Sequence, residues 1–273
     1  ARGEFPELTL EKKAPKNTQA LLIAAFEGED GIELPGTSLL KSAELREAYE
    51  SLIAVGATGK ANEVTRIPAP KKAEEDSVIA VGLGDAEDLD AETLRRAAGS
   101  AARSISKLEE VATSLGDFGI APTVEGLILG GYKFKGLRSK PGKDSEQPAA
   151  FTVVAEKSAR EELEAAKITA ESVLIARDLV NTPSNLLYPE SYADFLSAQA
   201  EEVGLDVEIL DEKALKKQGF GGITAVGRGS ARPPRLVRLS WSPKKAKKHV
   251  ALVGKGITFD TGGISLKPGS GMW

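Results

Sequence analysis

The chain has 273 residues, of which 36 are Lys or Arg and 40 are Asp or Glu, so its formal net charge is −4. Hydrophobic residues make up 41% and charged residues 28%, which is typical of globular proteins rather than disordered ones. The absence of cysteine and the single histidine, His249, exclude disulfides, thiolate zinc sites, cysteine nucleophiles and two-histidine metal sites. No apolar run approaches the ~18 residues that cross a bilayer, and no signal peptide is recognisable, so we expect a cytoplasmic protein without membrane contact.

Strand-like and helix-like segments alternate along residues 1–155, which we expect to form an amino-terminal α/β domain. Apolar residues at helical spacing predict two helices, over 39–55 and 91–115. The segment 135–148 carries Gly and Pro breaks among many charges and is predicted to be an exposed loop. Short apolar runs predict strands over 19–26, 77–83, 124–130 and 151–155.

The longest predicted helix covers 158–180, within a segment 156–182 that we interpret as a connector between two domains. Ser158 and Glu161 have the spacing of a capping box, and Thr182-Pro183 would end the helix. An ordinary surface helix is an equally good interpretation of this pattern. The second domain, 183–273, is predicted to hold helices over 189–203 and 212–218 and strands over 207–210, 236–241 and 249–253. The whole pattern predicts a two-domain α/β protein with mainly parallel sheets flanked by helices.

Several short motifs favour ordinary structural interpretations. Gly82 and Gly84 follow a predicted strand, but the third glycine of a dinucleotide-binding turn is missing. Gly254-Lys255 lacks the preceding glycine and the following Ser or Thr of a phosphate-binding loop. The basic run Lys244–Lys248 favours a solvated turn, with contact to an anion or a nucleic acid as the alternative.

The most informative segment is Val250–Pro268. An apolar predicted strand leads to Lys255 between two glycines, followed by Asp260, a Gly262-Gly263 turn and Lys267. Polar residues just beyond the carboxyl end of a parallel strand occupy the place where α/β folds bind ligands. Core packing does not explain two lysines and an aspartate there, so we interpret them as candidate site residues.

This segment closely resembles the signature of the leucyl aminopeptidase family, the two-metal cytosolic aminopeptidases. The resemblance continues through 176–183 and 219–230, and it is strong over 170–273 and looser over 1–155. It implies that Lys255 binds one divalent metal ion through a neutral amine and that Asp260 bridges two. Lys267 would be the catalytic ammonium that stabilises the oxyanion of the tetrahedral intermediate.

The resemblance also implies the reaction and its cofactors. Two Mn²⁺ or Zn²⁺ ions would activate a water molecule, bicarbonate would relay the proton, and the substrates would be peptides with a free amino terminus, preferably leucine. The protein would assemble as a homohexamer. The sequence does not decide between the two metals or define substrate preference beyond the amino-terminal residue.

The resemblance further implies that the catalytic domain is truncated. Only two of the five ligand residues expected from the family, Lys255 and Asp260, are present, so one carboxylate would face two dications. We therefore expect this chain alone to be inactive and to expose apolar surface in its second domain. The alternatives are a DNA-binding accessory protein, which only Lys244–Lys248 supports and the net charge opposes, and a non-catalytic assembly fragment of the same family.

Overall fold

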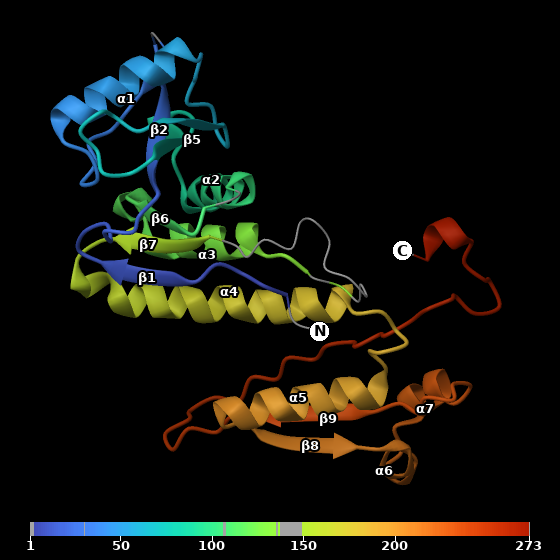
Figure 1. Ribbon diagram of the computed structural model, residues 1–273. Helices are drawn as coiled ribbons and strands as arrows, with labels where there is room; N and C mark the ends of the chain where they lie inside the picture. Colours follow the sequence, from blue (N-terminus) through green and yellow to red (C-terminus); the bar gives the residue numbers. More distant parts are fainter. Residues whose placement is uncertain (1–2, 30, 106–107, 135, 137–148, 273) are drawn as a thin grey trace. The chain divides into compact units, whose positions relative to one another are not determined.

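The computed structural model describes residues 3–29, 31–105, 108–134, 136 and 149–272. They form two compact units, and the boundary in the sequence lies between Asn181 and Thr182. The ribbon of the chain is shown in Figure 1. Most of the predicted loop 135–148 lies outside the described residues.

The first unit is built on a seven-stranded, mainly parallel sheet with the order β1-β7-β6-β2-β5-β4, to which β3 adds by pairing with β2 (Figure 1). Only β3 and β4 run antiparallel to their neighbours. The parallel α/β class expected from the sequence is therefore confirmed for this unit. The strands are β1 (Leu8–Glu11), β2 (Ala20–Gly28), β3 (Gly31–Glu33), β4 (Val64–Pro68), β5 (Ser77–Gly82), β6 (Glu110–Thr113) and β7 (Ala150–Val154).

Helices cover both faces of this sheet. Alternate residues of the central strand β2 point to opposite faces, so Leu22 and Ala24 enter one core and Leu21 and Ile23 enter the other. The first core is closed by α2 (Ala91–Ser104), α3 (Ile120–Gly131) and α4 (Arg160–Asn181), and the second by α1 (Ser42–Ala54). Three short 3₁₀ turns complete the unit: η1 (Ala86–Asp88), η2 (Leu115–Phe118) and η3 (Lys157–Ala159).

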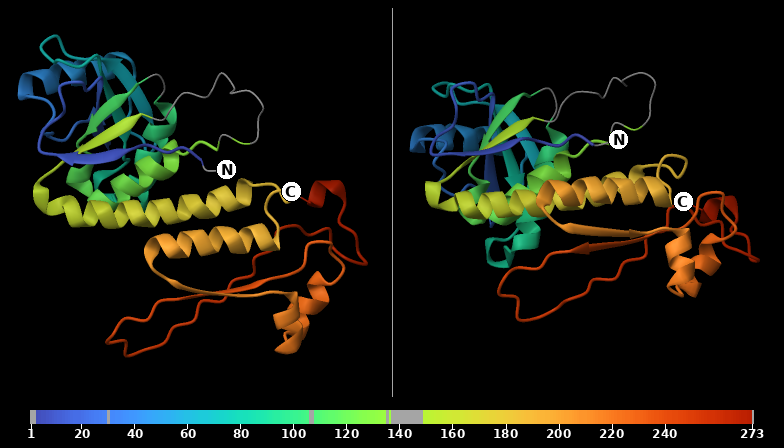
Figure 2. Two further views of the ribbon diagram at one scale, coloured as in Figure 1. Left: turned by 60° about the horizontal axis from the view of Figure 1, so that its bottom comes forward. Right: turned by 90° about the horizontal axis from the view of Figure 1, so that it is seen from below.

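The second unit is smaller and has an antiparallel sheet. Its strands β8 (Asp206–Leu210) and β9 (Leu236–Ser240) pair antiparallel and lie beside α5 (Pro189–Val203), as Figure 2 shows. The helices α6 (Glu212–Lys217) and α7 (Gly221–Gly227) lie between the two strands in sequence. After β9 the described chain has no further helix or strand until the 3₁₀ turn η4 (Gly269–Gly271).

The structure corrects several predicted elements. The helix expected over 91–115 ends at Ser104, and β6 follows because Glu110–Thr113 pairs with both β2 and β7. The strand expected over 124–130 is part of α3, since a short apolar run fits a buried helix as well as a strand. The strand expected over 249–253 is absent, and the sheet of the second unit is antiparallel rather than parallel. Helix α4 starts from the turn η3 instead of the predicted Ser158 capping box.

Candidate functional site

The three predicted site residues lie on an irregular, exposed part of the second unit, between β9 and η4. Val250, Leu252 and Val253, which were expected to form an apolar strand, have exposed fractions of 75%, 94% and 97%. No strand of the described residues pairs with this segment, so it forms no part of a sheet. Lys255 and Asp260 therefore follow an exposed segment rather than a buried strand.

Asp260 is the centre of a closed turn. Its Oδ1 accepts a hydrogen bond from the Gly262 N–H at 2.8 Å, and its Oδ2 lies 3.0 Å from Nζ of Lys267. The backbone N–H of Lys267 donates to the Thr261 carbonyl oxygen at 2.9 Å. These three contacts bring the predicted aspartate and the second predicted lysine together.

Glycine is required at position 262 of this turn. Its φ is +99°, in the region that disfavours residues with a side chain. A Cβ atom there would lie 2.3 Å from the Ser265 carbonyl oxygen, which belongs to the backbone and cannot simply rotate away. Because Gly262 also donates to Asp260, the backbone of the turn fixes how the carboxylate is presented.

The surroundings of Asp260 favour its charged form. The Gly262 N–H lowers the pKa of this carboxyl group, and so do the hydrogen bond and positive charge of Lys267 and, less strongly, the charge of Lys255. The side chains of Lys267 and Asp260 keep exposed fractions of 39% and 46%, so water screens the pair. The turn thus presents an ionised carboxylate beside an ammonium group at the surface.

Lys255 is held less directly. It is exposed, and its effect on Asp260 is through charge. The next residue, Gly256, lies against the ring of Tyr192 on α5, since a Cβ at position 256 would be 3.0 Å from the Tyr192 Cε1 atom. Tyr192 could not be predicted as part of the site, because no spacing pattern relates a tyrosine on α5 to a glycine far along the chain.

The donor set agrees with a divalent metal in type but not in number. A lysine amine and a carboxylate can both ligate such ions, yet the described residues contain no group of three His, Cys, Asp or Glu side chains that could hold one. Both oxygens of Asp260 already have partners in Gly262 and Lys267. A two-metal centre is therefore not completed by the described part of the chain.

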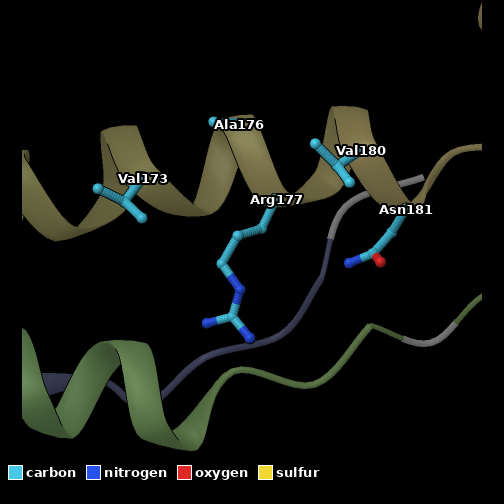
Figure 3. Close-up of a pocket in the computed structure, with 5 residues that line it drawn as sticks. All are labelled: Val173, Ala176, Arg177, Val180 and Asn181. Carbon is cyan, nitrogen blue, oxygen red and sulfur yellow. The ribbon is translucent and has the colours of Figure 1, made fainter. Parts of the chain in front are cut away.

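A separate hollow of about 360 Å³ lies beside the last turns of α4 in the first unit (Figure 3). Its main polar group, the Arg177 guanidinium, is already engaged: Nη1 donates to the Leu129 carbonyl oxygen at 2.8 Å, and Cζ lies 4.0 Å from the centre of the Tyr132 ring. The hollow therefore offers a ligand few polar groups that do not already have a partner. The residues that line the hollow are Val173, Ala176, Arg177, Val180 and Asn181.

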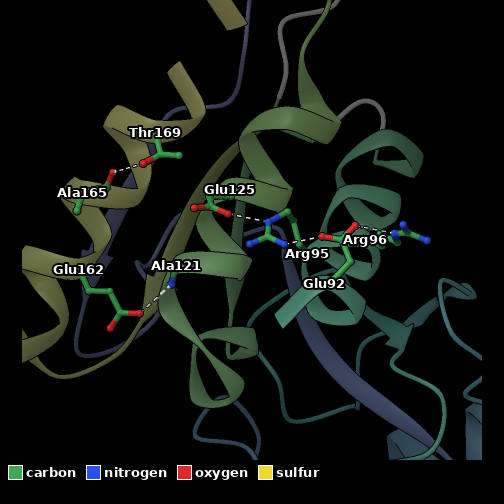
Figure 4. Close-up of polar contacts among 8 residues, drawn as sticks. All are labelled: Glu92, Arg95, Arg96, Ala121, Glu125, Glu162, Ala165 and Thr169. Carbon is green, nitrogen blue, oxygen red and sulfur yellow. Dashed lines mark hydrogen bonds and ion pairs between the residues drawn. The ribbon is translucent and has the colours of Figure 1, made fainter. Parts of the chain in front are cut away.

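The remaining charged clusters of the first unit join its helices to one another. Figure 4 shows Arg95 of α2 between Glu92 on its own helix and Glu125 on α3, with both N···O distances 2.6 Å. It also shows Glu162 of α4 accepting a hydrogen bond from the Ala121 N–H in the first turn of α3. Both contacts satisfy groups at helix surfaces and ends, so we interpret them as structural.

The basic run singled out in the sequence does not form a second candidate site. The basic run Lys244–Lys248 lies exposed in the loop after β9. In the described ranges, no helix combines the length and the apolar character needed to cross a membrane.

The first unit is thus a mainly parallel α/β domain, and the second presents Lys255, Asp260 and Lys267 on one exposed loop. Comparison with known proteins assigns both parts to one family. Residues 23–141 match the amino-terminal domain of the cytosol aminopeptidase family, and residues 174–273 match its catalytic domain. The chain therefore belongs to the cytosol aminopeptidase family.

Individual relatives agree with this assignment. The probable cytosol aminopeptidase of Corynebacterium diphtheriae is 56% identical over 100% of this chain and 55% of its own length. That of Corynebacterium glutamicum is 52% identical over 99% of this chain and 55% of its own length. The chain thus spans about half the length of the curated relatives that it matches.

Solved structures share the fold. The bottromycin maturation enzyme BotP superimposes with a TM-score of 0.73 at 30% identity, over 92% of this chain and 52% of BotP. The cytosol aminopeptidase from Coxiella burnetii has a TM-score of 0.69 at 24% identity, over 97% of this chain and 52% of its own. A further BotP structure, with a TM-score of 0.72, is a complex with Mn.

Proposed function

We propose that this chain is part of a metal-dependent aminopeptidase that releases amino-terminal residues, preferably leucine, from peptides. Family membership and the names of the relatives support the reaction class, and the BotP complex with Mn supports metal dependence. Because the chain spans about half of its relatives, the proposal concerns the longer protein. The chain by itself is expected to be inactive, since its donor set is incomplete.

The observation that carries the proposal is the 3.0 Å contact between Lys267 and Asp260. It supports an ammonium form of Lys267, and in the division of labour that we propose Asp260 and Lys255 supply metal ligands once the longer protein completes the site. Such an ammonium is suited to stabilise the negative charge that develops on the carbonyl oxygen of the cleaved peptide bond. The metal ions, when bound, supply Lewis acidity and a water molecule that loses its proton near neutral pH.

The finer properties belong to the same proposal. Mn²⁺ or Zn²⁺ would serve as the metal, since oxygen ligands suit the first and an amine suits the second. Bicarbonate would relay the proton, and the substrates would need a free amino terminus. The longer protein would form a homohexamer in the cytoplasm, in agreement with the word "cytosol" in the names of its relatives.

The test uses the longer protein and leucine p-nitroanilide. We expect exhaustive chelation to abolish hydrolysis and added Mn²⁺ or Zn²⁺ to restore it. Lys267→Ala should lower kcat by about 10²–10³-fold with unchanged metal content. Lys255→Ala should lose metal as well as activity.

Lys244→Ala provides a matched control, because it removes an exposed lysine from the loop after β9 without touching the turn around Asp260. It should leave both kcat and metal content unchanged. Hydrolysis that survives complete chelation would refute the proposal. Equal metal loss in the Lys255 and Lys267 variants would refute the division of labour between the two lysines.

A further inference from the structure

Three segments far apart in the sequence meet at the end of α4. They are the amino-terminal residues Gly3 and Glu4, the residues Tyr132 and Lys133 just after α3, and the last turn of α4. All three belong to the first unit. This meeting point plays no part in the candidate site, and the family assignment does not explain it.

Tyr132 stands at the centre of this cluster. Its hydroxyl donates to Oδ1 of Asp178 at 2.6 Å and accepts a hydrogen bond from Nδ2 of Asn181 at 3.2 Å. The guanidinium of Arg177 covers the face of its ring, with 4.0 Å between Cζ and the ring centre. Figure 3 shows this arginine reaching away from α4 toward the end of α3. One tyrosine therefore holds three residues of the same helical turn.

The amino-terminal segment closes the cluster from the other side. The Gly3 N–H donates to the same Asp178 oxygen at 2.9 Å. Glu4 and Lys133 exchange two backbone hydrogen bonds, of 2.8 and 2.7 Å, in an antiparallel bridge. The fit is tight, because a Cβ atom at Gly3 would lie 2.2 Å from Cε2 of Tyr132.

Apolar burial does little to hold this turn. Val180 has an exposed fraction of 85% and adds no hydrophobic anchor, and the nearest buried apolar residue of α4, Leu174 at 3% exposed, lies before residues 177–181. The last carbonyl groups of any helix lack partners within the helix, and helix ends fray first. The polar contacts to Tyr132 and Asp178, together with the hydrogen bond from Arg177 to the Leu129 carbonyl oxygen, restrain residues 177–181.

We propose that Gly3 and Glu4 form an amino-terminal strap, which locks the last turn of α4 through Tyr132 and Asp178 so that strap and turn open only together. Opening the turn requires the contacts of Arg177, Asp178 and Asn181 to break at once, and release of the strap removes the backbone bridge that positions Tyr132. The lock acts on the last helical turn before the second unit begins at Thr182.

Hydrogen exchange on the 273-residue chain tests the proposal. Tyr132→Phe removes the hydroxyl and keeps the ring, whereas Tyr49→Phe makes the same change on the exposed tyrosine of α1. Losing a hydrogen bond to a charged group should speed exchange roughly ten- to hundred-fold. We expect this acceleration at residues 177–181 and, equally, at the amides of Glu4 and Lys133. The Tyr49 variant should change none of these rates.

A second variant changes the strap instead of Tyr132. Gly3→Ala substitutes a strap residue and leaves α4 and the Tyr132 hydroxyl in place. It should also speed exchange at residues 177–181, because its Cβ displaces the Tyr132 ring. Amides of β2 report on global unfolding, so unchanged rates there would identify the opening as local in both variants. The proposal fails if Tyr132→Phe speeds exchange only at residues 177–181, or if Gly3→Ala speeds it only at Glu4 and Lys133. It also fails if exchange in β2 speeds up as much as exchange in these segments.

Discussion

Tyr132 shows how the surroundings of one side chain set its protonation. Burial, together with the hydrogen bond to Asp178, raises its pKa above the ordinary tyrosine value of about 10. Asp178 and Arg177 are the charged groups that face it from α4, and Lys133 is its neighbour in the sequence. Because the folded protein holds this proton more tightly, the resulting stabilisation is complete below pH ~10 and is lost as pH rises through the folded-state pKa.

Tyrosinate absorbance measures this directly. The chain has four tyrosines, and the difference between the titrations of the unmodified chain and of Tyr132→Phe isolates one of them. We expect the midpoint of that difference to lie above the ordinary tyrosine value of about 10. Asp178→Asn should move it back toward pH ~10, since the carboxylate that favours the neutral phenol is gone. A midpoint at or below pH ~10 in the unmodified chain would contradict the assigned cause.

The candidate site also shows what single residues reveal before a structure is known. The types and spacing of Lys255, Asp260 and Lys267 were enough to select them. The resemblance gave them separate roles, which stay predictions. The sequence did not show that Lys267 would pair with Asp260 or that Tyr192 would pack against Gly256. Those contacts depend on how the backbone turns at Gly262 and on where α5 lies, and neither follows from local residue pattern.

At the scale of elements, α2 and α3 approach each other closely through glycines. A Cβ at Gly126 would lie 2.3 Å from the Arg95 carbonyl oxygen, and one at Gly130 would lie 2.3 Å from that of Gly99. Gly130→Ala should therefore destabilise the first unit by about 1–3 kcal/mol, because the two helices must separate to admit the methyl group. This loss should exceed the gain of up to about 1 kcal/mol from the better helix propensity of alanine.

Urea unfolding followed by far-ultraviolet circular dichroism checks the direction of this change. Gly222→Ala on α7 is the matched control, since nothing lies within 4 Å of its added Cβ and only the propensity effect remains. It should leave the midpoint of the first unit unchanged. An unchanged or higher midpoint for Gly130→Ala would mean that the helices adjust without cost.

The same contact explains why part of the element prediction was wrong. An apolar run with glycines resembles a strand, but α3 is apolar because it lies between the sheet, α2 and α4, and its glycines face α2. Residues 110–113 appeared to continue a helix, and they form β6 because two neighbouring strands offer them hydrogen bonds. The strands β2, β5 and β7 were predicted correctly, because a buried parallel strand is marked by its own composition.

At the scale of the whole molecule, the alternating pattern predicted the α/β class of the first unit, and the structure confirms it. It failed in the second unit, where the only described sheet is antiparallel and two-stranded. The strand expected over 249–253 needs a neighbour to pair with, and sequence pattern cannot tell whether one is present. The proposed domain boundaries at 155 and 182 stay a prediction.

That unpaired segment leads to a prediction about the chain as a whole. Leu252 and Val253 are almost fully exposed, and Val250 and Leu266 are 75% and 69% exposed in the same unit. Exposed apolar side chains that stand close together bind hydrophobic dyes and promote association, and Val250, Leu252 and Val253 are near neighbours in the sequence. We expect the 273-residue chain to enhance the fluorescence of anilinonaphthalene sulfonate and to form aggregates without a fixed size as its concentration rises. The longer protein should not bind the dye and should not associate beyond its proposed hexamer.

The double variant Leu252→Ser/Val253→Ser should weaken both effects, because it removes the two most exposed apolar side chains between Val250 and Gly254. Val55→Ser/Val203→Ser is the control, since these valines are 62% and 69% exposed but belong to different units, one just after α1 and the other at the end of α5. It should leave dye binding and sedimentation unchanged, as isolated exposed apolar residues are common on stable proteins. Equal effects of the two double variants would mean that the dye binds elsewhere. If the unmodified chain does not bind the dye, residues 250–253 are buried against other residues of the chain in solution.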